Sequence, residues 1–350
     1  MLYTQHMVCR NNYMDTKLKK LFAKGTNFLG VKFPIMGGAM TWVSENNLVA
    51  ATCNAGGFGV IAAGSMNEEE LRQEIINTRK KTNKPFGVNL ILLHPRIESL
   101  IETCIKQKVD LVVFAGGFPK KRQIAKLRIN GLKTMCFATT VSIAKKMISY
   151  GIDGLILEGN EAGGHIGPVS VNVLVQEILP EVIDIPIFVA GGIGRGEIFL
   201  KYLELGAAGC QIGTRLVCSE ESVAHQKFKE IFIKSEARNC QISIRLDSRF
   251  PVIPVRAIEN NASRKFIEEQ KKVLKLLEKN EISLKEAQLK IEHFWAGSLR
   301  KAVVDGDIEN GSLMAGQSVS LVKKIQPVRD ILNEIVNQAS QQLTNDKKAV

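Results

Sequence analysis

Residues 185–214, IPIFVAGGIGRGEIFLKYLELGAAGCQIGT, contain the pattern that decides the fold. Two short apolar runs, 187–190 and 209–212, are each followed by glycine, and a longer amphipathic stretch separates them. Short β-branched runs that alternate with helical stretches predict successive βα units and a parallel sheet. The same alternation covers residues 31–214, and it adds six predicted strands at 32–36, 58–62, 85–90, 111–114, 133–137 and 154–157.

Eight βα units close into a (β/α)8 barrel (TIM barrel), the predicted fold class of this chain, for which roughly 250 residues suffice. Residues 67–80 and 142–150 are helical candidates between strands, and the first has acidic residues in its first turn and basic residues in its last. That charge order suits the helix dipole. A doubly wound sheet is the alternative fold, but it needs fewer strands.

The pattern changes after Thr214. Residues 220–239 and 263–295 are charged and have a helical period, and they flank the strand-like run 252–258. The sequence therefore predicts a helical insertion or cap over 220–295. The barrel is then assigned to 28–219 and 296–340, with a closing helix at 327–338, a flexible extension at 1–27 and a flexible tail at 341–350.

Composition restricts the class of protein. The seven cysteines are scattered without a C-x-x-C pair, which favours a reducing cytoplasm without disulfides or a metal site. No run of 18 uncharged apolar residues predicts a membrane span, and the start lacks the apolar segment of a signal peptide. The net charge of +12 would attract an acidic partner, but zinc-finger spacing and aromatic RNA-binding motifs are missing, which argues against nucleic acid.

Candidate site residues follow the strand ends, because barrel active sites are built from the βα loops at that face. Glycines recur after four predicted strands, at Gly37-Gly38, Gly163-Gly164, Gly191-Gly192 and Gly213. One glycine pair is equally consistent with a tight turn, but glycines after both the seventh and eighth strands predict a phosphate site. Their N–H groups can approach an anion without obstruction by Cβ, and Thr214 adds a hydroxyl.

Five polar side chains near the predicted strand ends are further candidates. His165 ends the motif EAGGH, at 161–165, where an imidazole can hydrogen-bond and transfer protons near neutral pH. Asn89 ends the third strand, where its amide either caps a turn or binds the edge of a flavin-like heterocycle. Glu158 is assigned to cofactor contact, the role of Glu161 is left open, and His94 is a weaker candidate at the mouth of the barrel.

These motifs resemble the nitronate monooxygenase (2-nitropropane dioxygenase) superfamily, which includes the FMN-dependent enoyl-acyl carrier protein reductases of type II. The similar blocks are residues 34–38, 54–59, 84–89, 158–167, 190–193 and 211–215, and EAGGH is the most specific motif among them. The resemblance implies an FMN barrel in which His165 is catalytic. The implied cofactor contacts are Gly37, Gly38, Asn89, Glu158, Gly163, Gly164, Gly191, Gly192, Gln211, Gly213, Thr214, Met314 and Gln317.

The resemblance implies two alternative activities. In the reductase branch NAD(P)H reduces FMN, and the flavin passes hydride to an enoyl thioester; the basic surface would suit an acidic acyl carrier protein. In the monooxygenase branch an alkyl nitronate is oxidised with flavin and oxygen. Residues 39–42, 214–222 and 302–317, together with glutamate at position 158, favour the reductase. A non-redox barrel that binds a phosphate ligand is a third hypothesis, and the oligomeric state, a homodimer included, is left open.

Overall fold

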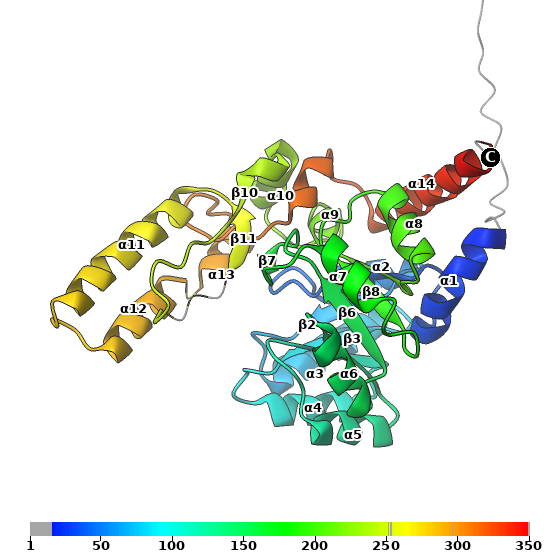
Figure 1. Ribbon diagram of the computed structural model, residues 1–350, viewed down its shortest axis with the longest axis horizontal. Helices are drawn as coiled ribbons and strands as arrows, with labels where there is room; N and C mark the ends of the chain where they lie inside the picture. The colour runs from blue at the N-terminus through cyan, green and yellow to red at the C-terminus, as the bar shows by residue number, and fades with distance from the viewer. Residues whose placement is uncertain (1–15, 251, 253, 296, 349–350) are drawn as a thin grey trace, which may run out of the picture.

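Eight parallel strands wrap around a common axis in the computed structural model, which describes residues 16–348 except 251, 253 and 296 (Figure 1). The strand order is β1-β9-β8-β6-β5-β4-β3-β2. A parallel bridge between Met36 and Phe58 brings the two ends of this order together. The predicted (β/α)8 barrel is confirmed.

The strands keep the order and spacing that the sequence predicts. Their bounds are β1 Ile35–Gly37, β2 Val60–Ala62, β3 Gly87–Ile91, β4 Leu111–Ala115, β5 Lys133–Phe137, β6 Gly154–Glu158, β8 Ile187–Ala190 and β9 Gly209–Ile212. The helices that alternate with them are α2 Asn46–Asn54, α3 Glu68–Lys81, α4 Ile97–Lys106, α5 Lys121–Ile129, α6 Val141–Ser149, α7 Val171–Ile178, α8 Gly196–Glu204 and α9 Thr214–Val217. Predicted and observed strand bounds differ by at most three residues at one end.

Strand β4 shows why the strands are apolar throughout. Leu111 and Val113 belong to a small cluster of buried residues drawn from most strands of the barrel. Val112 and Phe114, which alternate with them, belong to the larger core that also contains the helices. Successive strand residues point to opposite faces, and a parallel strand is covered on both. The barrel interior is therefore packed with side chains below the site.

Both predicted flexible ends differ from the structure where it describes them. Helix α1, Thr16–Leu29, buries Leu18 and Phe22, and the Phe22 ring lies 5.6 Å from the ring of Phe199 in α8. Residues 1–15 of the predicted extension lie outside the described residues. Helix α14, Val328–Lys348, packs against α8 and continues through the predicted tail, where Leu343 is fully buried. Charged and polar residues around these apolar positions conceal their helical spacing in the sequence.

The segment after β9 contains α10 Gln226–Lys234, β10 Cys240–Ile242, β11 Val255–Ile258, α11 Asn261–Glu278 and α12 Leu284–Trp295. Helices α11 and α12 form a hairpin that projects from the barrel (Figure 1). The hairpin has its own small core, which includes Phe250, Phe266 and Ile291. In α10, by contrast, Phe228 and Phe232 belong to the main core. The predicted insertion at 220–295 thus contains one part that packs with the barrel and one part that stands apart.

The chain returns to the barrel through α13 Ser298–Val303 and the short 3-10 helix η2 Gln317–Leu321 before α14 begins. In the part of the chain that the structure describes, no helix is both long and apolar enough to cross a membrane.

Candidate active site

A cavity of about 600 Å³ opens where the barrel strands end. This volume lies within the range of small-molecule and cofactor sites, roughly 300–1,000 Å³. Most residues predicted from the sequence line the cavity. They are Gly38, Asn89, Glu158, Gly163, Gly164, His165, Gly191, Gly192, Gln211, Gly213, Thr214 and Met314.

Two predicted contact residues lie outside the lining that the described residues form. Gly37 belongs to the barrel seam, where its N–H donates to the carbonyl oxygen of Phe58 at 2.8 Å. Gln317 starts η2, and its backbone N–H donates to the carbonyl oxygen of Glu161 at 2.9 Å. Gln317 therefore contributes to the site through the backbone of the 158–167 segment.

One side of the cavity is backbone rather than side chain. We call residues 191–193 and 213–214, which follow β8 and β9, the glycine wall. Gly191 and Gly192 have φ of +97° and +69°, and a Cβ added at Gly191 would lie 3.1 Å from the carbonyl oxygen of Gly159. Among the described residues, nothing accepts a hydrogen bond from the N–H groups of Gly191, Gly192 and Gly213. Free backbone donors on a concave surface suit an anion such as a phosphate.

The adjacent side is the segment 158–167, which we call the histidine loop; it contacts the glycine wall, because β6 neighbours β8 and Gly191 lies against Gly159. A Cβ at Gly163 would lie 2.6 Å from the backbone nitrogen of Gly316, so only glycine allows the loop to approach residues 315–316 so closely. The next two residues, Gly164–His165, form strand β7, which pairs antiparallel with β11 of the insertion. The loop is therefore supported on one side by the 314–317 segment and on another by the insertion.

Desolvation shifts the pKa of two titratable side chains in this loop, His165 and Glu158. Surrounding protein atoms desolvate His165 and lower its pKa, although the ring is exposed to the cavity, so the imidazole is neutral at pH 7. Desolvation raises the pKa of Glu158 to about 8, so its carboxyl group keeps its proton at neutral pH. Within the described part of the chain, neither side chain has a hydrogen-bond partner. Both are available to a ligand.

Two further polar residues have defined partners. Asn89 is buried in the middle of β3 and not at its end as the sequence predicts, and its Nδ2 donates to the carbonyl oxygen of Val113 at 3.2 Å. The carboxylate of Glu161 accepts the N–H of Val171 at 3.0 Å, at the start of α7. A carboxylate at a helix N-terminus is favoured by the helix dipole. Glu161, whose role the sequence leaves open, thus stabilises the loop and the helix after it.

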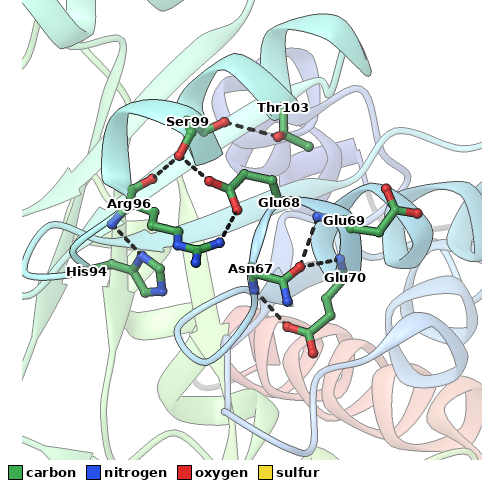
Figure 2. A network of polar contacts seen from close by, with 8 residues as sticks. All are labelled: Asn67, Glu68, Glu69, Glu70, His94, Arg96, Ser99 and Thr103. Atoms are coloured by element: carbon green, nitrogen blue, oxygen red, sulfur yellow. Dashed lines mark hydrogen bonds and ion pairs between the residues drawn. The ribbon is translucent and has the colours of Figure 1, made fainter.

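His94 lies outside the cavity lining and takes part in a network between the starts of α3 and α4 (Figure 2). Its Nδ1 accepts the backbone N–H of Arg96 at 3.1 Å, and the Arg96 guanidinium pairs with Glu68 at 2.9 Å. Ser99 donates to the carbonyl oxygen of Arg96 in the same network. His94 therefore stabilises a turn, and His165 is the histidine in the cavity.

The sequence interpretation overlooked the side of the cavity after β4 and β5. Gly116, Gly117 and Phe118 line the cavity after β4, and Thr139 lines it after β5. The pair Gly116-Gly117, which directly follows an apolar run, was the available signal. Leu93 is 74% exposed and Phe118 is 48% exposed. Together they form an apolar rim at the mouth of the cavity.

Comparison with known proteins identifies a matching family model, related proteins and a similar solved structure. Residues 23–100 and 96–338 match the family model described as nitronate monooxygenase. The (3aS,4S,5R,7aS)-5-hydroxy-7a-methyl-1-oxo-octahydro-1H-indene-4-carboxyl-CoA dehydrogenase of Rhodococcus jostii (strain RHA1) is 30% identical, over 90% of this chain and 94% of that protein. A probable nitronate monooxygenase of Staphylococcus aureus (strain Newman) is 29% identical, over 90% of this chain and 97% of that protein. The structure of FabK from Thermotoga maritima matches with a TM-score of 0.83 at 36% identity, and covers 93% of this chain and 98% of that one.

Proposed function

The chain belongs to the nitronate monooxygenase family of oxidoreductases, and we propose that it is an FMN-dependent enzyme that transfers electrons from NAD(P)H to an enoyl thioester. The observation that carries this proposal is the arrangement of one cavity. Free backbone donors lie on the glycine wall, His165 and Glu158 lie on the histidine loop, and the apolar rim of Leu93 and Phe118 lies at one side of the mouth. The glycine wall suits the phosphate of a cofactor, the histidine loop suits the reacting group of a substrate, and the apolar rim suits an acyl chain.

The residues of the cavity fit FMN. The N–H groups of Gly191, Gly192 and Gly213 would bind its phosphate, since they have no acceptor among the described residues. Gly163 and Gly164 present backbone without side chains, against which a flat ring can lie. FMN, when bound, supplies hydride transfer between the nicotinamide and the substrate.

Glu158 suits contact with such a ring because it is neutral. With its pKa raised to about 8, the carboxyl group can donate a hydrogen bond at neutral pH, as a glutamine amide would. A carboxylate at the same place would only accept. Glu158 is thus proposed to bind the heterocycle without adding a negative charge to the cavity.

His165 is proposed to act on the substrate. Its lowered pKa leaves a neutral ring with one N–H donor and one acceptor nitrogen at neutral pH. The N–H can donate to the carbonyl oxygen of a thioester, where negative charge develops when hydride adds to the β-carbon of the double bond. The α-carbon then takes up a proton to complete the reduction.

The apolar rim favours a thioester over a small nitronate. Leu93 and Phe118 expose apolar surface at the mouth, which suits an acyl chain that continues out of the cavity. The Rhodococcus jostii relative carries a carboxyl-CoA group in the name of its substrate, so a thioester has a precedent among the relatives. The net charge of +12 is compatible with an acidic acyl carrier protein as the source of the chain.

Absorbance under anaerobic conditions tests the proposal. The purified protein is expected to bind FMN, NADH or NADPH is expected to bleach it, and crotonyl thioester is expected to restore its colour. If neither nucleotide reduces the bound flavin, the reductase activity is excluded. Protein that carries no flavin and takes up no added FMN would instead support a non-redox phosphate-binding barrel.

The second candidate function is the oxidation of alkyl nitronates with oxygen. The neutral imidazole of His165 favours it, because a neutral ring can act as a base in the cavity. This activity needs no nicotinamide, so oxygen uptake with propyl nitronate alone is the measurement that separates the two functions. Uptake at the background rate would exclude it.

A further inference from the structure

The histidine loop is paired with a strand that lies far along the chain. In the three-stranded sheet β10-β11-β7, the middle strand β11 pairs with the loop in the register Val255↔His165 and Arg256↔Gly164. The N–H of Ile166 also donates to the carbonyl oxygen of Pro254 at 3.1 Å. The backbone on both sides of His165 is therefore attached to the insertion.

The side chain of Arg256 adds a second attachment at the other end of the loop. Its Nε donates to the carbonyl oxygen of Asn160 at 2.8 Å, and its Nη1 donates to the carbonyl oxygen of Cys240 at 2.6 Å. Arg256 is only 6% exposed. A buried guanidinium is costly unless its N–H groups find acceptors, and hydrogen bonds from a charged donor are stronger than neutral ones.

We propose that Arg256 is a positioning residue that fixes the histidine loop, so that the insertion after β9 completes the active site of the barrel. The residue joins three segments: it bonds Asn160 at the start of the loop, pairs with Gly164 in its middle and bonds Cys240 of β10. Lysine has one nitrogen on a flexible stem and cannot reproduce the planar fork that reaches both carbonyls. This inference rests on the proposed role of His165 in catalysis.

Hydrogen exchange of the flavin-free protein tests the positioning role without any activity measurement. In Arg256→Met, amide exchange within 158–167 is expected to rise about tenfold or more, since the charged hydrogen bond to Asn160 and the one to Cys240 are lost. Exchange in the barrel strands is expected to stay unchanged. Arg256→Lys is expected to restore part of the protection. Arg238→Met is the matched control, because Arg238 is an exposed arginine of the same insertion and its ion pair is with nearby Glu236 at 2.7 Å.

Unchanged exchange in 158–167, or a rise spread evenly over the barrel, would overturn the proposal. Kinetics and flavin titration give the second readout: Arg256→Met is expected to lower kcat by about tenfold while FMN affinity changes less than about threefold, because the Arg256 side chain holds the histidine loop and not the N–H donors of the glycine wall. An unchanged kcat would also overturn it. If the wild-type enzyme fails to reduce the thioester, the proposed function fails, and the exchange result still decides whether Arg256 fixes the loop.

Discussion

The two sides of the cavity are both rich in glycine, yet they differ in what they offer and in what supports them. The glycine wall presents N–H groups, and it directly follows strands β8 and β9 of the barrel. The histidine loop starts at Glu158, the last residue of β6, and presents side chains. Its later part is attached to β11 and to residues 314–317, which lie far along the chain. The difference indicates that the two segments have separate roles, which we call the division. The barrel supplies an anion site from its own strand ends, and later segments position His165, the side chain proposed to act on the substrate.

If this division is correct, changes on the two sides should separate cofactor affinity from turnover. His165→Ala tests it with the largest expected effect. The variant should bind FMN with unchanged affinity but lower kcat by about 10²–10⁴-fold, the usual contribution of a group that transfers protons or polarises the substrate. Flavin titration and steady-state kinetics measure the two quantities. His94→Ala is the control, since His94 supports a turn outside the cavity; loss of flavin in His165→Ala would contradict the division.

Gly191→Ala should weaken FMN binding, the property that His165→Ala leaves unchanged. At φ of +97° an alanine is strained, and its Cβ would press on the backbone of Gly159. A cost of about 1–3 kcal/mol at this position is expected to move the N–H donors and to weaken FMN binding by about tenfold or more.

Gly206→Ala separates backbone strain from the loss of the anion site. Gly206 has φ of +104°, but a Cβ there would meet nothing within 4 Å. This control should lower the melting temperature while FMN affinity, measured by fluorescence titration, stays at the wild-type value. Equal losses of affinity in both variants would mean that general strain, and not the glycine wall, determines binding.

The fold and half of the site could be predicted from the sequence because they depend on local pattern. Alternating apolar runs predict the strands. Residues at or near the carboxyl ends of barrel strands must meet at one face, so Asn89, Glu158 and Gly191 could be predicted to lie together. The side after β4 was also predictable, because Gly116-Gly117 follows an apolar run in the same way.

The remaining features depend on contacts that no local pattern encodes. Arg256 and Asn160 are separated by 96 positions, and a two-residue strand such as β7 has no detectable period. The neutral state of Glu158 depends on burial by several segments at once. The closing helix predicted at 327–338 is the first part of α14, but helix α1 and the part of α14 after residue 338 were missed because a buried stripe is diluted by charged residues on the other faces.

Glu158→Gln tests the protonation state of the histidine loop. The folded pKa of about 8 lies above the unfolded value of about 4.3, so the native state binds a proton that the unfolded state lacks between these pH values. The contribution of Glu158 to stability therefore falls as pH rises through this window, and the cost of its buried charge is complete above pH 8.

The glutamine variant lacks this pH dependence. Relative to wild type, its melting temperature should rise by a few degrees between about pH 5 and 9, measured on flavin-free protein. Glu177→Gln, on the exposed face of α7, should follow the wild-type curve. A Glu158→Gln curve parallel to wild type at all pH values would show that the carboxyl group is already ionised at neutral pH.

Thr214→Val has the smallest expected effect, and it tests whether the two sides are independent. The Thr214 hydroxyl accepts the N–H of Gly316 at 3.0 Å, and the next residue, Gln317, donates to Glu161 in the histidine loop. Valine keeps the shape of the side chain but leaves the Gly316 N–H without its acceptor, at a cost of about 1 kcal/mol. FMN affinity should fall about fivefold, and kcat should fall about twofold because residues 316–317 join both sides. Thr214→Ser should retain both values. A change in affinity with unchanged kcat would mean that the glycine wall and the histidine loop are positioned separately.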